Sequence, residues 1–274
     1  GSIAGNPALN SSVQTTNNLL FSYPSYSEIF TGEARDTVIK SNKQIQNKFP
    51  SFFQFLQKKK KLNYNQVASF ATWEVMDQIV SNDSKAFLAN AAYEELDSKD
   101  KNVRELYKLQ FLTPTYWKRF RHDFYTFQLA LAHTIRYKPR VLHIAFGETD
   151  KWAHTKDYER MFRSIHRVDG FLKELWSFIQ SNKRYRNKTT IIITTDHTRG
   201  NTKETWYFHN KKTPEARNIW MAFISPNSNL RGEWKNSETI YLNQIASTLC
   251  KFLGYNYLEQ SPNAGKAIEQ VFSK

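Results

Sequence analysis

Two pairs of aspartate and histidine residues that stand close together in the sequence could hold a metal ion. Asp150 and His154 are four residues apart, and Asp196 directly precedes His197. If the chain turns helical after residue 147, the first pair projects from one face of a helix, where a carboxylate and an imidazole can chelate a metal ion. The same spacing also occurs on ordinary surface helices. Asp150 and His154 are therefore candidate ligands that need support from other residues.

The Asp196–His197 pair follows a Thr- and Ile-rich run, residues 190–195, that is typical of a strand. Consecutive strand residues point to opposite faces of a sheet, so these two side chains cannot both enter the core. Burying either of them without a partner would cost free energy. Two interpretations remain: a functional site at the end of a strand, or a solvated strand end.

Ser22 is the third candidate for chemistry. It precedes Tyr23 and Pro24 and a helix-like stretch over residues 25–30, which Thr31 and Gly32 close. A hydroxyl at a helix N-terminus lies where backbone N–H groups can hold a phosphate. A serine at such a position also serves, more commonly, as the N-cap of the helix.

The elements that must position these residues alternate between strand and helix. Apolar runs predict strands over 67–73, 141–146, 190–195 and 219–224, and their continuous β-branched and aromatic residues suit a mainly parallel sheet that is covered on both faces. Apolar residues at three- and four-residue spacing predict helices over 121–137, 158–179 and 242–253, the last one stopped by Gly254. This alternation predicts an α/β fold with ligands bound at the carboxyl ends of the strands.

The composition fits one domain with a large core. The chain has 274 residues, of which 40% are hydrophobic, and no linker divides it, so we predict a single domain over 1–274. Cys250 is the only cysteine, which excludes an intrachain disulfide and a thiolate zinc cluster. A transition metal would therefore need histidine and carboxylate ligands. No apolar run approaches the length of a transmembrane segment.

The chain carries a formal net charge of +14. Such an excess suits anionic ligands, including phosphoesters, nucleic acid and acidic membranes, but it also arises from lysine-rich solvated surfaces. The only basic run, residues 58–61, lies at the end of a helix-like stretch, where positive charge favours the helix dipole. Nucleic acid is thus not indicated beyond the net charge. The first residues, Gly1 and Ser2, look like a cleavage scar, so the sequence does not reveal the compartment.

Three segments together resemble the alkaline phosphatase superfamily. Residues 22–32, SYPSYSEIFTG, are similar to its nucleophile segment, a Thr, Ser or Cys followed by x-Pro and later by Thr-Gly. Residues 147–154, GETDKWAH, resemble its Asp-x-x-x-His ligand pair, and residues 194–200, TTDHTRG, resemble its Asp-His motif. Their order and their positions at strand ends also match. The resemblance implies a three-layer αβα fold with a mainly parallel central sheet.

The resemblance implies two divalent metal ions, zinc or alternatively manganese. One ion would be held by Asp150, His154 and a later histidine, the role that falls to His209. The second would be held by Asp196, His197, the nucleophile Ser22 and an aspartate from the family's first strand. The sequence predicts no such strand between Gly1 and Ser22 and has no aspartate there. We therefore expect this N-terminal metal-ligand strand to be absent and the second site to lack one ligand.

The resemblance further implies a metal-dependent hydrolase of small phosphoesters. Metal-activated Ser22 would attack phosphorus, and water would hydrolyse the phosphoseryl intermediate. Asn42 and Arg199 would bind phosphate oxygens. A phosphomutase or phosphotransferase of the same superfamily, or a degenerate anion-binding scaffold, are the alternatives. Tyr26 stands where the sulfatase nucleophile motif has arginine, which argues against a sulfatase. Export to the periplasm would agree with the resemblance.

Four other histidines are predicted to be packing residues rather than ligands. His143 falls within a predicted strand, and the others fall within predicted helices: His122, His133 and His166. A histidine in such a position is usually hydrogen-bonded to its neighbours.

Overall fold

The computed structural model describes residues 1–96 and 98–272 and divides into two compact units. The middle unit comprises Gln44–Leu175, and the terminal unit comprises Gly1–Lys43 with Trp176–Lys274. The long helix α7 (Tyr158–Ser181) begins in the middle unit and ends in the terminal unit. The single domain over 1–274 stays a prediction, and we describe each unit by itself.

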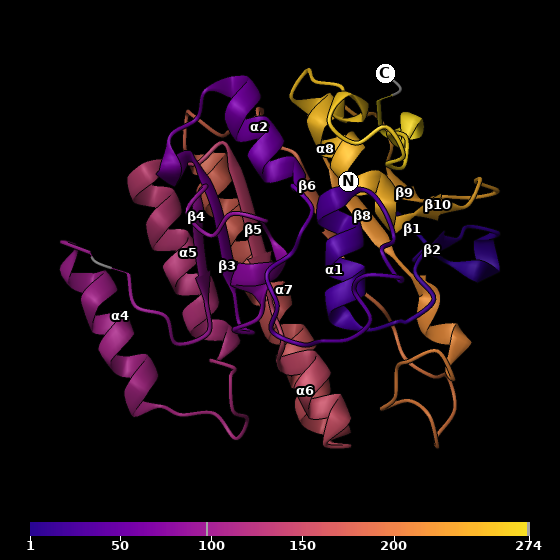
Figure 1. Ribbon diagram of the computed structural model, residues 1–274, viewed down its shortest axis with the longest axis horizontal. Helices are drawn as coiled ribbons and strands as arrows, with labels where there is room; N and C mark the ends of the chain where they lie inside the picture. Colours follow the sequence, from indigo (N-terminus) through magenta and orange to yellow (C-terminus); the bar gives the residue numbers. More distant parts are fainter. Residues whose placement is uncertain (97, 273–274) are drawn as a thin grey trace. The chain divides into compact units, whose positions relative to one another are not determined.

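The middle unit contains a three-stranded parallel sheet of order β4-β3-β5 (Figure 1). Its residues 67–71 and 141–145 pair in register from Val67 opposite Val141 to Ala71 opposite Ala145. The parallel pairing predicted from the apolar runs is confirmed here. The elements are α2 (Phe52–Lys60), the 3-10 turn η2 (Tyr64–Gln66), β3 (Val67–Ala71), α3 (Met76–Ile79), β4 (Leu88–Ala91), α4 (Lys101–Leu112), α5 (Asp123–Tyr137), β5 (Val141–Ala145), α6 (Glu148–His154) and most of α7.

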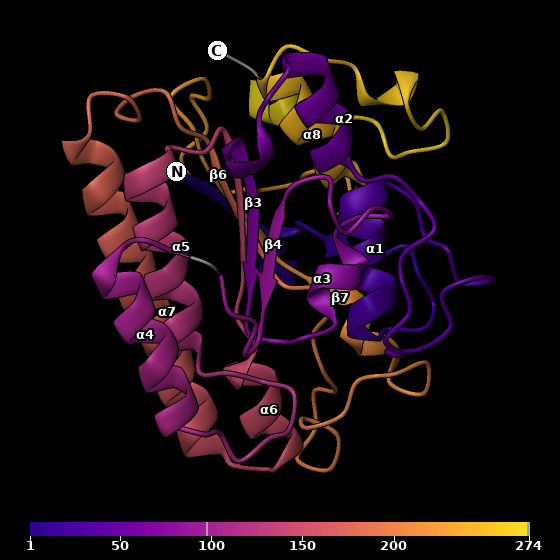
Figure 2. The same ribbon diagram turned by 60° about the vertical axis from the view of Figure 1, so that its left-hand side comes forward.

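Helices cover both faces of this sheet. On one face, Phe70 of β3 packs in a cluster with Leu129 of α5 and Tyr107 of α4, and Figure 2 shows α4, α5 and α7 on that side. On the other face, the ring of Phe53 from α2 lies 6.0 Å from the ring of His143 in β5. Every residue of β3 is buried, because this central strand lies between the two helical layers. The middle unit is thus a three-layer αβα arrangement.

The terminal unit holds two small sheets, of order β6-β8-β1-β9 and β10-β2-β7. Their pairing is mixed rather than mainly parallel: β8 is antiparallel to both β6 and β1, and β9 is parallel to β1. The elements are β1 (Ser2–Ala4), η1 (Pro7–Leu9), β2 (Val13–Gln14), α1 (Ser22–Thr31), β6 (Ile191–Thr194), η3 (Pro214–Arg217), β7 (Asn218–Ile219), β8 (Met221–Ile224), β9 (Gly232–Glu233), β10 (Ile240–Tyr241), η4 (Leu242–Gln244), α8 (Ile245–Phe252), η5 (Tyr257–Glu259) and η6 (Glu269–Phe272).

Two short strands that the sequence did not predict precede Ser22. Both β1 and β2 lie there, but they have only three and two residues, too few to form an apolar run in the sequence. They form because β1 pairs with β8 and β2 pairs with β7. Gly5 follows the first strand and Thr15 the second, so neither strand ends in the carboxylate that the resemblance implies.

Two strands that were expected to be covered on both faces are only half-buried. All residues of β6 and the first four residues of β5 have intermediate exposure. Each is the outermost strand in its sheet, with a described partner strand on one side only. An edge position therefore explains why these apolar runs are less buried than β3.

Glycines end two helices of the terminal unit. Gly32 follows α1 with φ 76°, and Gly254 follows α8 with φ 83°, both in the left-handed region that glycine adopts readily. Helix α1 begins at Ser22, three residues earlier than the sequence predicts, and packs against η4 and α8. The predicted closure of the nucleophile segment by Thr31 and Gly32 is confirmed.

The Gly32→Ala variant should lower the free energy of unfolding by about 2 kcal/mol. Its φ of 76° is unfavourable for alanine, and the new Cβ would lie 2.5 Å from Cβ of Ala264. Urea denaturation followed by circular dichroism measures the change. Gly170→Ala is the matched control, because a Cβ there meets no atom within 4 Å and the helical position should favour alanine by about 1 kcal/mol. Equal effects of the two substitutions would contradict the expectation.

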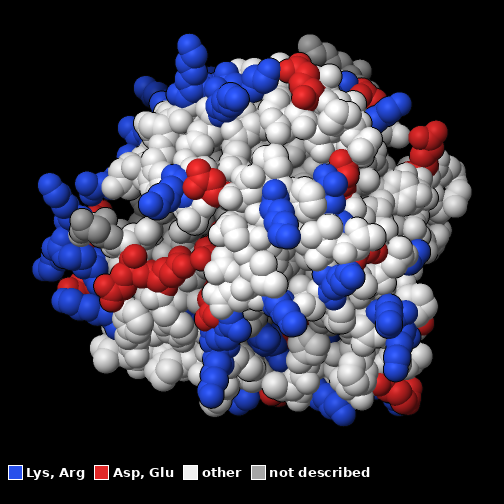
Figure 3. All heavy atoms as spheres, viewed as in Figure 1, with Lys and Arg blue, Asp and Glu red and all other residues white. Residues whose placement is uncertain are grey.

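Basic side chains are spread over the surface shown in Figure 3, with acidic and uncharged groups between them. The net charge of +14 therefore does not gather into one basic patch on this face. None of the described helices has the length and apolar character that crossing a lipid bilayer requires.

Candidate active site

Ser22 is the first residue of helix α1 and faces a histidine. The N-cap is Phe21, whose side chain makes no capping hydrogen bond, so the N-cap interpretation of Ser22 was wrong. The hydroxyl of Ser22 lies 3.2 Å from Nε2 of His197, in the loop after β6. Ser22 and His197 are 175 residues apart in the sequence, and the fold of the terminal unit brings them together.

His197 is oriented by its backbone neighbours. Its Nδ1 lies 3.1 Å from the carbonyl oxygen of Thr198, which assigns the ring proton to Nδ1 and leaves Nε2 as the acceptor for the Ser22 hydroxyl. The hydroxyl of Thr195 donates to the carbonyl of His197 at 2.7 Å. Oδ2 of Asp196 lies 3.3 Å from Nε2, so two atoms with lone pairs face each other. That geometry suits a shared cation, and nitrogen with carboxylate oxygen is a donor set typical of zinc.

His209 stacks on His197, with ring centroids 3.7 Å apart and an interplanar angle of 14°. Its Nδ1 donates to the carbonyl of Leu20 at 2.8 Å, which makes Nε2 the nitrogen with the lone pair. Only 7% of His209 is exposed. Asp196, His197, His209 and Ser22, all candidates from the sequence, therefore form one cluster in the terminal unit.

The loop between the two histidines has a close backbone approach that places His209. The N–H of Gly200 donates to the carbonyl of Phe208 at 3.1 Å, and a Cβ at Gly200 would lie within 2.7 Å of three atoms of Thr205. Nη1 of Arg199 donates to the carbonyl of Tyr207 at 2.7 Å. This hydrogen bond links Arg199 to the part of the loop that carries His209.

Asn42 contacts helix α1 at its N-terminus. Its Oδ1 accepts a hydrogen bond from the N–H of Tyr23 at 2.9 Å, which satisfies one of the N–H groups in the first turn of α1. The amide nitrogen of Asn42 is the donor end of the same group. Asn42, singled out from the sequence as a phosphate-binding residue, therefore lies beside Ser22.

Sequence reasoning missed Glu28 and Asn17, which hold the segment before Ser22. The Glu28 carboxylate is fully buried and accepts from the N–H groups of Thr16 and Asn17 at 2.8 and 3.0 Å. Burial raises the pKa of Glu28, although these hydrogen bonds act in the opposite direction. Oδ1 of Asn17 accepts from the N–H of Leu20, a residue with φ 55°. A single charged residue, Glu28, within the predicted helix at 25–30 was the available signal.

Asp150 and His154 both lie on α6 in the middle unit. Nε2 of His154 is 3.4 Å from Oδ1 of Asp150, so the predicted helical pair on one face is confirmed. Their side chains are 29% and 39% exposed, which leaves them accessible to a metal ion. The other six candidate residues belong to the terminal unit.

Two buried carboxylates, those of Asp123 and Glu148, lie at the start of α6, and the sequence did not reveal them. Burial, and next the charge of Glu148, raise the pKa of Asp123 to about 6. Burial alone would also raise the pKa of Glu148, but the hydrogen bond with His122 and the charge of Arg167 outweigh it and lower that pKa.

Three of the four other histidines have the hydrogen-bonded contacts predicted for them, whereas His166 is exposed on α7. Nδ1 of His143 is 2.9 Å from the hydroxyl of Ser69, and burial lowers the pKa of His143 to about 4. Nε2 of His133 lies 2.9 Å from the carbonyl of Asn65, and burial lowers its pKa also. His122 is the N-cap of α5 and contacts Glu148, and His166 packs edge-on against Phe162.

Solved structures of two other proteins share the fold. Ps i-CgsB in complex with k-i-k-neocarrahexaose is 13% identical, and the match covers 99% of this chain and 67% of the other with a TM-score of 0.58. A histidine-to-glutamate mutant of TAB5 alkaline phosphatase with Mg bound in its M3 site is 12% identical, with coverage of 89% and 87% and a TM-score of 0.52. No curated protein sequence matches the chain. The α/β, alkaline phosphatase-like fold is confirmed.

The sequence also matches a family model over residues 24–250, which is most of the chain. That family is described as type I phosphodiesterase / nucleotide pyrophosphatase, and its chemistry supports phosphoester hydrolase activity. The match spans the segments that hold Asn42, Asp150, Asp196 and His209. The chain therefore belongs to the type I phosphodiesterase / nucleotide pyrophosphatase family of the alkaline phosphatase superfamily.

Proposed function

We propose that the chain hydrolyses small phosphoesters by attack of Ser22 on phosphorus. The contact between the Ser22 hydroxyl and Nε2 of His197, at 3.2 Å, carries this proposal. In the first step the bond from Oγ to phosphorus forms and the bond from phosphorus to the leaving oxygen breaks. The leaving group keeps the electron pair and takes up a proton, and water then cleaves the phosphoseryl bond.

The residues present fit two divalent ions, for which zinc is the first choice and manganese the second. Asp196, His197 and Ser22 would hold one ion, at a site without the further aspartate that the resemblance implies, and Asp150, His154 and His209 are the proposed ligands of the other. When bound, the ions would favour the serine alkoxide and stabilise charge on the phosphate oxygens. The stacked geometry of His197 and His209, each oriented through Nδ1, supports their role as ligands.

The substrate phosphate would lie at the N-terminus of α1. Helix N-termini attract anions, and this ten-residue helix has no acidic residue in its first turn. The amide nitrogen of Asn42 would donate to a phosphate oxygen, since its Oδ1 is held by the N–H of Tyr23. Arg199 is a second candidate for this role, although one of its nitrogens is used by the carbonyl of Tyr207.

Trapping the covalent intermediate tests the proposal. The zinc-loaded chain is mixed with an aryl phosphodiester and quenched in acid within one turnover, and mass spectrometry locates the phosphoryl adduct. We expect the adduct, which keeps one ester group, on the peptide that contains Ser22. The Ser22→Ala variant should give no adduct there, whereas Ser27→Ala, on the same helix, should give a normal one. Turnover by Ser22→Ala within a few-fold of the parent chain would refute the role of Ser22.

A further inference from the structure

Helix α6 is too short to be stable by itself. It has seven residues, whereas isolated helices below about 12 residues are marginal in water. Its N-cap, Gly147, has no side chain to satisfy the N–H groups of the first turn. Yet α6 carries both Asp150 and His154. The contacts that hold its first turn therefore decide how firmly this pair is placed.

Asp123 supplies those contacts from the neighbouring helix α5. Its Oδ1 accepts a hydrogen bond from the N–H of Gly147 at 2.8 Å, and its Oδ2 accepts one from the N–H of Glu148 at 3.1 Å. The hydroxyl of Thr72 also donates to Oδ1, at 2.5 Å. Only 1% of Asp123 is exposed, so water does not compete for these bonds. Asp123 thus caps α6 from outside.

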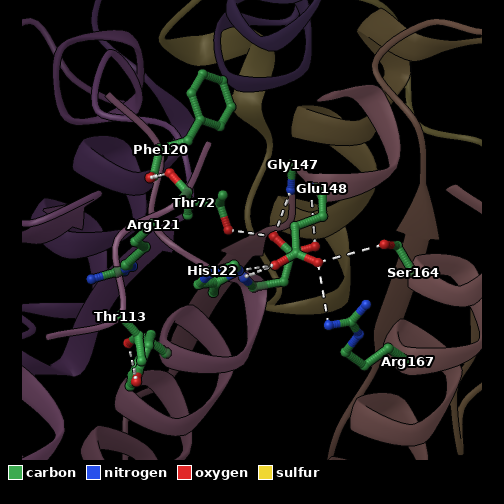
Figure 4. A network of polar contacts seen from close by, with 12 residues as sticks. Thr72, Thr113, Phe120, Arg121, His122, Gly147, Glu148, Ser164 and Arg167 are labelled. Atoms are coloured by element: carbon green, nitrogen blue, oxygen red, sulfur yellow. Dashed lines mark hydrogen bonds and ion pairs between the residues drawn. The ribbon is translucent and has the colours of Figure 1, made fainter. Parts of the chain in front are cut away.

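Glu148, the first residue of α6, returns the contact. Its Oε1 accepts from the N–H of Asp123 at 3.2 Å and from Nδ1 of His122 at 2.8 Å, at the start of α5. Its Oε2 lies 3.5 Å from the hydroxyl of Ser164 and from Nη1 of Arg167, both on α7 (Figure 4). Each carboxylate therefore caps the helix of the other, and Glu148 also ties α6 to α7.

Burying two carboxylates side by side is costly, and apolar residues of similar size would often be at least as stable. Here the two hydrogen bonds that Asp123 accepts define where the first turn of α6 begins, which gives a reason why two buried carboxylates are kept. Asp150 lies two residues after Glu148 in that turn. A shift of the turn would change the 3.4 Å spacing of Asp150 and His154.

We propose that Asp123 and Glu148 are positioning residues that hold α6 so that Asp150 and His154 bind metal as a pair. This inference rests on the proposed function, in which these two residues are ligands. Neither Asp123 nor Glu148 is among the proposed metal ligands or phosphate-binding residues. Asp123 and Glu148 act on the proposed ligands by holding the first turn of α6. Mutation of groups that orient metal ligands typically lowers metal affinity by about 10- to 100-fold.

Zinc titration of the whole chain tests the proposal, together with amide hydrogen exchange of residues 148–154 in the metal-free protein. Asp123→Asn keeps one acceptor oxygen and loses the other, so one N–H of the first turn loses its partner. We expect weaker zinc binding by about 10- to 100-fold and faster exchange in α6. Glu148→Gln, which keeps its shape, should act in the same direction and is the second variant should the first not fold.

Asp100→Asn is the matched control. Asp100 caps α4 in the same unit, where its side chain accepts from the N–H of Asn102 at 2.9 Å, and α4 carries none of the proposed ligands. This variant should leave zinc affinity and α6 exchange unchanged. A lower melting temperature of folded Asp123→Asn and Glu148→Gln, with zinc affinity and α6 exchange unchanged, would overturn the proposal.

The ligand assignment itself can fail separately. If Asp150→Ala and His154→Ala bind zinc as the parent chain does, the proposed ligands are wrong. The exchange of α6 in the Asp123 and Glu148 variants then still decides whether these carboxylates hold the helix.

Discussion

Replacing His197 by alanine should lower phosphoester turnover by about 10³-fold or more, since several kcal/mol of charge stabilisation would be lost. His197 contacts three other candidate residues, namely Ser22, Asp196 and His209. Its removal takes away a proposed metal ligand and the partner of the proposed nucleophile at once. Hydrolysis of an aryl phosphodiester, with metal content measured by mass spectrometry, gives the result.

His166→Ala is the control for this experiment, because His166 is exposed on α7 and packs only against Phe162 among the contacts described here. It should keep turnover and metal content. Circular dichroism must show that both variants are folded. Turnover by His197→Ala within tenfold of the parent chain would rule out His197 as a ligand.

The second large effect concerns Asp150 and His154. Replacing either one by alanine should remove about one ion per chain and lower hydrolysis by orders of magnitude, since the metal would lose one of its protein ligands. The fold should persist, because these side chains are 29% and 39% exposed. Metal analysis after gel filtration and unfolding in urea measure both quantities.

Asp169→Ala serves as the carboxylate control, since Asp169 is exposed on α7 and has no proposed ligand role. It removes the same charge without touching α6. A well-folded Asp150→Ala chain with the metal content of the parent would show that the resemblance assigned this ligand wrongly.

The sequence predicted the local parts of the site and most of the long elements. Asp150 with His154, and Asp196 with His197, are neighbours in the sequence, and the four-residue spacing of the first pair indicates one face of a helix. The strands at 67–71 and 141–145 were predicted, over slightly longer ranges, from continuous apolar runs, and the helix at 158–181 was predicted over 158–179 from apolar periodicity. Periodicity does not give strand direction, so the antiparallel pairing of β6 with β8 could not be read from it.

The rest depends on contacts between distant residues. The stack of His197 on His209 joins two residues that are separated by a loop with a close approach of Gly200 to Thr205, and no pattern in the sequence predicts this loop. Asp123 and Glu148 are 25 residues apart, and the sequence does not show that they are partners, because they come together only where α5 and α6 meet. Strands β1 and β2 have too few residues to predict at all, since pairing with β8 and β7 is what forms them.

The position of β6 at the edge of its sheet has a consequence for how that sheet can be extended. Strand β6 presents Ile191, Ile192 and Ile193 with no charged residue among them, and its only described neighbour is β8. An apolar edge with unpaired N–H and C=O groups is a template for pairing with another chain, and natural proteins usually protect such edges with lysine, proline or a bulge. Within the described sheet of its own unit, β6 therefore has one edge where a further strand can be added, and such a strand would complete the backbone hydrogen bonding of its three isoleucines.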